Sequence, residues 1–268
     1  MVSEVARKGE RVFRDARGVS SHRIGTQMQR LIRREWTRFH YARSSLLTRH
    51  DASRCSNRST TSIRKVSPKK AVPFYSRSAD FFCSMGRLGM AGKAYREAAE
   101  QLESCELPED ALSFYEKAAD LFETENQASE TNKCKLKMAS MHAELGRELK
   151  AVSLFEDVAK KSVDNNLLKY SVKGYLLQAG LCHLGTGDCE ATQEALERYE
   201  DLDVTFSGTR ECKFLQDLLA AVREGDTDQF TAVVTEFDSM TRLDAWKTRR
   251  LLKAKQAIEN GDGEDDLT

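Results

Sequence analysis

A short pattern of small and aromatic residues recurs along the chain from residue 71 onward. A small residue is followed four positions later by an aromatic residue, and three positions after that by a second small or apolar residue. This spacing places all three side chains on one face of a helix. The copies are Ala71-Tyr75-Ser78, Ala111-Tyr115-Ala118, Ala151-Phe155-Val158 and Ala195-Tyr199-Leu202. Each copy predicts a helix packed closely on a neighbour, because the small residues admit the neighbour and the aromatic ring fills the space beside it.

The first three copies start 40 residues apart, and the fourth starts 44 residues after the third. Other stretches with the periodicity of half-buried helices lie between them, over residues 90–102, 133–145 and 167–184. Pro108 is placed to begin a helix, Gly146 to end one, and residues 185–188 to separate two. The predicted fold is all-α: a tetratricopeptide-like, right-handed stack of antiparallel helical hairpins, with a repeat longer than the usual length of about 34 residues.

Beyond residue 206 the pattern changes to helices with short connections. They are predicted over residues 208–222, 227–237 and 242–258, with joints at Gly225-Asp226 and Asp238-Ser239. Their apolar residues can form a compact C-terminal bundle that caps the stack. Five acidic residues and no basic residue follow Lys255, so the ending is predicted to be exposed and mobile.

The net charge of zero conceals a division of the chain near residue 70. Residues 1–70 contain 18 Lys and Arg against 5 Asp and Glu, whereas the remainder contains 24 against 37. We therefore predict three parts: a basic, disordered segment over 1–70, a hairpin array over 71–206, and a bundle with an acidic tail over 207–268.

The basic segment allows several interpretations. Residues 28–47 have apolar and Arg positions at helical spacing, as in a helix that lies on an anionic membrane. The segment is also rich in Arg and Ser like an organelle transit peptide, although acidic residues near its start count against this. A solvated tail without a role of its own is the simplest interpretation. Nucleic-acid binding is not predicted, because aromatic residues at regular spacing are missing.

Other features favour a cytoplasmic protein without catalytic or metal chemistry. No apolar run is long enough to span a bilayer, and the start lacks the apolar core of a secretory signal. Seven irregularly spaced cysteines do not form a disulfide pattern, and Cys182-His183 with Cys189 lacks the usual zinc spacing. His142 lies beside an apolar stripe, as a packing residue does, and a phosphate-binding glycine loop is missing. We predict no enzyme activity, no cofactor and no metal.

Several stretches resemble the alpha-type soluble NSF-attachment proteins, particularly those of plants. They are MGRLGMAGK (85–93), EDALSFYEKAAD (109–120), NKCK (132–135), NLLKYSVKGY (166–175), FSGTREC (206–212), EFDSM (236–240) and EDDLT (264–268). Such blocks in this order are specific, because a generic tetratricopeptide protein would not share the last three. The resemblance covers about residues 71–268.

The resemblance implies an adaptor that performs no chemistry itself. Such adaptors bind SNARE complexes, bundles of syntaxin-type helices, and stimulate the hexameric NSF ATPase that disassembles them. They serve vesicle fusion and intracellular protein transport, including ER–Golgi transport, from the cytoplasm with peripheral attachment to membranes. The SNARE-binding positions that it implies are Arg87, Lys93, Lys133, Lys137, Lys169, Lys173 and Arg210. The ATPase-binding positions that it implies are Glu264, Asp265, Asp266 and Leu267.

The spacing of the lysines partly supports the SNARE-binding positions that the resemblance implies. Lys93 and Lys133 are one 40-residue repeat apart and should project alike from successive hairpins. A further 40 residues lead to Lys173, but the interval of 39 residues between Gly146 and Gly185 would place Val172 there instead. Clustered bases in an otherwise acidic array suit an acidic helical partner through steering and complementarity.

Residues 1–70 depart from the family, since they show neither its first helical hairpins nor its apolar, membrane-touching loop. We therefore expect a weaker grip on SNAREs and a weaker membrane contact. Two alternatives stay open. One is a helical-repeat scaffold for another partner, and the other is a truncated competitor of intact family members.

Overall fold

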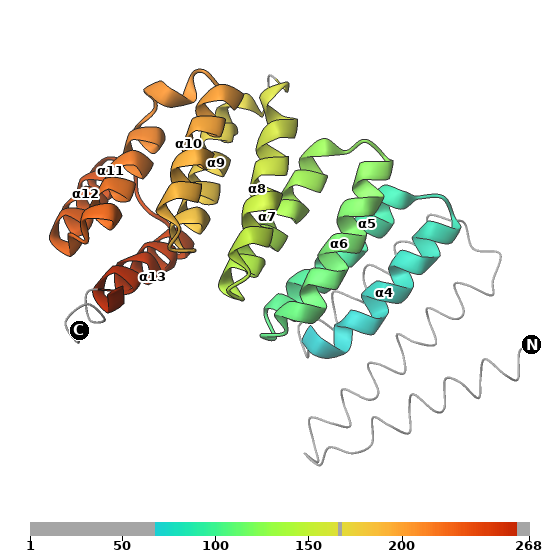
Figure 1. Ribbon diagram of the computed structural model, residues 1–268. Coiled ribbons are helices and arrows are strands. Elements are labelled where there is room, and N and C mark those ends of the chain that lie inside the picture. Colours follow the sequence, from blue (N-terminus) through green and yellow to red (C-terminus); the bar gives the residue numbers. More distant parts are fainter. Residues whose placement is uncertain (1–67, 166–167, 262–268) are drawn as a thin grey trace, which may run out of the picture. The chain divides into compact units, whose positions relative to one another are not determined.

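The computed structural model describes residues 68–165 and 168–261, and these ranges contain helices and no strands (Figure 1). The helices are α4 (Pro68–Ser84), α5 (Leu88–Glu103), α6 (Pro108–Thr124), α7 (Ala128–Glu144), α8 (Glu148–Val163), α9 (Lys169–Leu184), α10 (Cys189–Leu202), the 3₁₀ helix η1 (Phe206–Gly208), α11 (Arg210–Glu224), α12 (Thr227–Met240) and α13 (Ala245–Gly261). The predicted all-α stack of hairpins is confirmed. No described helix combines the length and the apolar character needed to cross a membrane.

The chain divides at Leu107 into two compact units. The first contains the hairpin α4–α5, and the second contains α6 to α13. Within the second unit, α6 pairs with α7 and α8 with α9, while α7 also packs on α8 and so joins the two hairpins.

The aromatic residues of the recurring pattern are the buried centres of the hairpins. Tyr75 is buried on α4, and Tyr115, Phe155 and Tyr199 are buried on α6, α8 and α10. The described small residues of the first three copies are also buried, whereas Leu202 of the fourth is half-buried. Small side chains let the partner helix approach and the ring then fills the gap, so the pattern predicted the buried face of each first helix.

The turns between helices explain the length of the repeat. Gly86, Glu106, Asn126 and Gly146 follow one another at equal intervals, and their φ values lie between 57° and 73°. After each, the next backbone N–H donates to a carbonyl five residues earlier, as from Arg147 to His142 at 2.9 Å. This is the bond of a Schellman motif, in which one left-handed residue satisfies the last carbonyls of a helix. One helix with its turn therefore occupies half of the repeat, and a hairpin occupies the whole of it.

Two glycine-to-alanine substitutions in the second unit should have opposite effects on stability. A Cβ at Gly146 or at Gly174 would meet no atom within 4 Å, but Gly146 has φ +73° and Gly174 lies inside α9. Gly146→Ala should lower the free energy of unfolding by about 1 kcal/mol, because an L side chain is strained in the left-handed region. Gly174→Ala should raise it by roughly 0.5–1 kcal/mol, because alanine favours the helix. Urea unfolding followed by circular dichroism measures both, and equal signs would contradict the assignment.

The helices of the C-terminal bundle begin or end a few residues from where they were predicted. The joint predicted at Asp238-Ser239 is wrong, since α12 continues through Met240 and the connection falls at residues 241–244. Asp238 lies within α12, and its carboxylate accepts a hydrogen bond from the backbone N–H of Leu243 at 2.7 Å. Asp238 therefore stabilises the connection from within α12, whereas the sequence suggested that it interrupts the helix.

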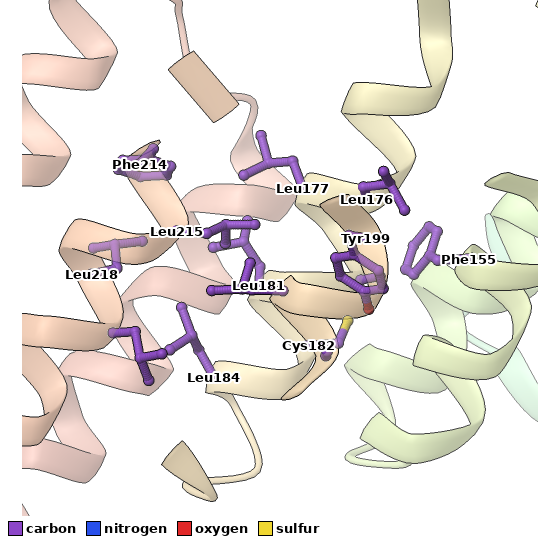
Figure 2. Close-up of a cluster of buried hydrophobic side chains, with 14 of the residues drawn as sticks. Phe155, Leu176, Leu177, Leu181, Cys182, Leu184, Tyr199, Phe214, Leu215 and Leu218 are labelled. Atoms are coloured by element: carbon purple, nitrogen blue, oxygen red, sulfur yellow. The ribbon is translucent and has the colours of Figure 1, made fainter. Parts of the chain in front are cut away.

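The bundle is joined to the hairpins through a continuous apolar cluster, which Figure 2 shows in close-up. Leu181 of α9 and Leu215 of α11 both lie in it, and Phe214 stacks on Phe237 of α12 with ring centroids 4.1 Å apart. Gly180 makes the α9–α11 contact close, since a Cβ there would lie 2.5 Å from Leu215 Cδ1. The last helix, α13, packs on α12 and also on α9. The contact between α13 and α9 was not expected from the sequence.

Candidate partner-binding surface

Acidic and basic side chains separate between the first and second helices of the hairpins in the second unit. The first helices, α6, α8 and α10, carry thirteen acidic and five basic side chains. The second helices, α7, α9 and α11, carry eight basic and five acidic side chains. Clustered basic side chains together make the local electrostatic potential positive. The second helices are therefore the part of this unit suited to an acidic partner.

Side-chain contacts show which helices lie side by side. Lys161 of α8 pairs with Glu123 of α6 at 2.6 Å, and Tyr199 of α10 donates to Glu156 of α8 at 2.8 Å. The first helices therefore form one layer of the array (Figure 1). In the same way, α9 and α11 are neighbours, since Lys173 pairs with Glu211 at 3.0 Å.

The candidate cations of the second unit are exposed and lie on its second helices. They are Lys133 and Lys137 on α7, Lys169 and Lys173 on α9, and Arg210 on α11. The two pairs of lysines are four residues apart, so each pair projects from one helix face. Lys173 pairs with Glu211, the residue that follows Arg210. Lys173 therefore lies beside the start of α11. The structure thus brings together the candidates of α9 and α11.

The burial of the residues before each lysine fixes the register of the lysines in the repeat. Asn132 and Val172 are both buried, whereas the next residues, Lys133 and Lys173, are both exposed. The spacing of the first repeats therefore holds as far as α9, and Lys173, not Val172, corresponds to Lys133. Lys93 likewise follows a buried residue, Gly92, on α5 of the first unit.

Lys133 and Lys173 already have an acidic partner within the described residues. Lys133 pairs with Glu130 at 2.8 Å, one turn earlier on the same helix, and Lys173 pairs with Glu211. Lys169 and Arg210 have no ion-pair partner within residues 68–165 and 168–261. Both stand at the first position of a helix, where the helix dipole disfavours a cation. Helix stability therefore does not explain these two cations.

The remaining candidates are Arg87, which precedes α5 and is exposed in the first unit, and the acid-leucine group at the end of the sequence. Glu264, Asp265, Asp266 and Leu267 lie outside the described residues. Their attachment point is the end of α13 at Gly261.

Residues 36–259 match the family described as "Soluble NSF attachment protein, SNAP". The chain belongs to this family. It is 46% identical to the alpha-soluble NSF attachment protein of Vitis vinifera over 222 residues, which cover 82% of this chain and 77% of the relative. The beta-soluble NSF attachment protein of Bos taurus is 39% identical, over 82% of this chain and 74% of its own length. A probable vesicular-fusion protein sec17 homolog of Schizosaccharomyces pombe is 37% identical, over 77% and 71%.

The match to the soluble NSF attachment proteins begins at residue 36. It therefore includes part of the basic segment 1–70 that we expected to lie outside the family. That segment lies outside the described residues as far as residue 67.

The interior of this family member also contains polar side chains, and they bind one another. Glu156 accepts the hydrogen bond of Tyr199, and His183 Nε2 lies 3.7 Å from the same carboxylate oxygen. The proximity of His183, together with the hydrogen bond from Tyr199, lowers the pKa of Glu156, while burial raises the pKa of Tyr199. Glu156 thus stays ionised and Tyr199 protonated at neutral pH, and together they connect α8, α9 and α10.

The cysteine beside His183 is also an interior residue. Cys182 is fully buried, and burial raises its pKa to about 12, so it stays a neutral thiol, which is a poor metal ligand. Among the described residues, no three His, Cys, Asp or Glu side chains are grouped closely enough to hold a metal ion.

Two exposed residues near the candidate cations were missed by the sequence analysis. Lys213 is exposed on α11, one turn beyond Arg210, and Tyr170 follows Lys169 on α9 with 86% of its surface exposed. Lys213 could have been found by extending the basic positions along α11. Tyr170 could not, because an aromatic residue in an apolar repeat is normally read as buried.

Proposed function

We propose that this protein is an adaptor that binds SNARE complexes and recruits and stimulates the NSF ATPase for their disassembly. The observation that carries the proposal is the separation of charge between the two helix layers, in a chain whose relatives are named NSF attachment and vesicular-fusion proteins. The side formed by α7, α9 and α11 would face the acidic helical bundle of the SNAREs. Complementary potentials of this kind raise the rate of encounter and fix the register of two partners.

The cations on α9 and α11 fit this role better than a purely structural one. Lys169 and Arg210 oppose the dipoles of their own helices and have no acidic partner within the described chain. An acidic helix placed against them would supply the missing counter-charge. We assign SNARE binding to Lys133, Lys137, Lys169, Lys173 and Arg210, together with Arg87 and Lys93 of the first unit.

We further propose that the adaptor does no chemistry of its own and acts from the cytoplasm with a weak peripheral membrane contact. Residues 71–206 would hold the SNARE complex, and residues 207–268 would present Glu264, Asp265, Asp266 and Leu267 to the ATPase. The hydrogen bond from Tyr199 to Glu156 gives both groups a structural role, since it joins α10 to α8.

A reconstituted disassembly reaction tests the proposal. The purified chain, the NSF ATPase, ATP and a preformed SNARE complex should together give ATP-dependent release of SNARE subunits, with little release when the chain is left out. A chain that binds neither the SNARE complex nor the ATPase would overturn the proposal and favour a scaffold for another partner. A chain that inhibits a complete family member in the same reaction would identify the truncated competitor instead.

Charge reversal at Lys169 should weaken SNARE binding without affecting the fold. Lys169→Glu reverses an exposed cation that has no ion-pair partner within the described residues, and the new acid at the first helix position suits the dipole. We expect affinity for the SNARE complex to fall roughly threefold at low salt, since surface charges act mainly through the association rate. The matched control is Lys150→Glu, which changes the charge equally on α8 of the other layer. Equal loss of affinity in both variants would show that net charge, not the α9 surface, is responsible.

A further inference from the structure

The last helix is held to the turn between α7 and α8 by a buried ion pair. Arg250 of α13 donates from Nη1 to Glu148 Oε1 at 2.8 Å and to the backbone carbonyl of Ala143 at 2.6 Å. Arg250 and Glu148 are 8% and 6% exposed, which is rare for charged residues. Lys253, one turn further along α13, also donates to Glu148 Oε1 at 2.6 Å. Two cations of α13 thus converge on one carboxylate of the repeat array.

Further contacts line the same side of α13. The Trp246 indole N–H donates to the carbonyl of Ser140 at 3.3 Å, and its ring lies edge-on to Phe155 with centroids 5.7 Å apart. At the surface, Arg249 pairs with Glu144. These contacts connect residues that are far apart in the chain, and they attach α13 to α7 and α8 as well as to its neighbour α12.

The Glu148–Arg250 pair is not arranged for greatest stability. Glu148 Oε2 and Arg250 Nε are buried and have no hydrogen-bond partner. A buried ion pair with unsatisfied atoms contributes little to net stability, and apolar residues of similar size often do as well. Removing one partner is different, because a buried charge then loses its closest buried counter-charge. Among the described residues, Glu148 without Arg250 keeps only Lys253, whose side chain is 46% exposed. Without Glu148, Arg250 has no acid beside it in this part of the chain, and Cys182 cannot compensate, since burial raises its pKa to about 12 and keeps it neutral.

We propose that Glu148 and Arg250 are positioning residues for the ATPase-facing end of this adaptor. Their pair fixes α13 on the α7–α8 turn, and α13 ends at Gly261, three residues before the acid-leucine group. The SNARE-binding array thereby determines where the acidic ending starts. A fixed attachment point lowers the ordering cost when the ATPase binds, whereas a detached α13 would have to be ordered in that step. This inference rests on the proposed function.

The test compares single and double substitutions in the full chain. Glu148→Gln leaves the buried Arg250 guanidinium without a counter-charge, and Arg250→Met leaves Glu148 with only the half-exposed Lys253. Glu148→Met with Arg250→Met instead replaces both by apolar side chains of similar length. Arg249→Met removes the neighbouring surface pair with Glu144 and is the matched control. Three quantities are measured: amide hydrogen exchange of α13, SNARE binding, and ATP hydrolysis by the ATPase as a function of adaptor concentration.

Each single variant should exchange faster over α13 and need roughly tenfold more adaptor for half-maximal stimulation. The maximal rate and SNARE binding should stay unchanged, because the acid-leucine group and the second helices are intact. For the double apolar variant, the adaptor concentration that gives half-maximal stimulation should return to within about threefold of the wild-type value. Arg249→Met should give the wild-type value. If Arg250→Met does not fold, Glu148→Gln provides the comparison, because it keeps the side-chain shape and an acceptor oxygen.

Some results would overturn the inference alone. One such result is normal hydrogen exchange over α13 in the single variants, and another is half-maximal stimulation at the wild-type adaptor concentration. A third is a loss of stimulation in the single variants that the double apolar variant shows as well. If the wild-type chain itself fails to stimulate the ATPase, the proposed function is overturned and the inference falls with it. The two failures are therefore distinguishable from the wild-type measurement.

Discussion

Replacing Phe155 with alanine is expected to lower the free energy of unfolding by about 3–5 kcal/mol, the usual cost of removing a large aromatic side chain from a core. Phe155 is fully buried in the middle of α8. Its ring belongs to the same apolar cluster as Leu176 of α9 and Tyr199 of α10, beside which Figure 2 shows it, and it meets Trp246 of α13 edge-on. The cavity in α8 would thus be lined from α9, α10 and α13, and packed helices close such a space only partly.

Urea unfolding followed by circular dichroism measures the effect of Phe155→Ala. The control is Leu149→Ala on the same helix, since Leu149 is 71% exposed, and it should change the free energy of unfolding by less than about 0.5 kcal/mol. A loss below about 1 kcal/mol for Phe155→Ala would show that the helices around it collapse into the space, or that they are not packed as described.

Phe155 also shows why the fold could be predicted so far from the sequence. Its neighbours in the recurring pattern, Ala151 and Val158, lie on the same helix, so the pattern is local and can be read without knowing any tertiary contact. The turns were only partly readable. Gly146 was recognised because glycine favours a positive φ, whereas Glu106 and Asn126 adopt the same backbone without being glycine. Their even placement between Gly86 and Gly146 was the available evidence.

The attachment of α13 could not be predicted, because nothing local announces it. Glu148 and Arg250 are 102 residues apart, and each reads as an ordinary charged helix residue. The same limit applies to the Lys173–Glu211 pair, which shows that α9 and α11 are neighbours. The separation of acidic and basic side chains could be predicted in part, since the lysines recur with the period of the repeat. It became clear only when the structure assigned each helix to the first or second place in its hairpin.

Replacing Leu267 with alanine should abolish stimulation of the ATPase at concentrations where the wild type saturates, while SNARE binding stays unchanged. Leu267 is the apolar side chain in an ending that contains Glu264, Asp265 and Asp266. The neighbouring acids can attract a basic partner over a distance, but exposed charges add little affinity each. Burying a leucine contributes about 1.5–3 kcal/mol, or roughly 10- to 150-fold in affinity, so the leucine should be the anchor of the contact.

ATP hydrolysis and a SNARE pull-down, measured on the same preparation, test this prediction. Glu264→Gln is the control and should reduce stimulation only slightly, because it removes one charge of several and leaves the anchor. Hydrogen exchange over α13 should be normal in Leu267→Ala, which separates loss of the anchor from loss of the Glu148–Arg250 attachment. Normal stimulation by Leu267→Ala would mean that the ending is a solubilising acidic tail, and the repeat array would then have to contact the ATPase directly or serve another partner.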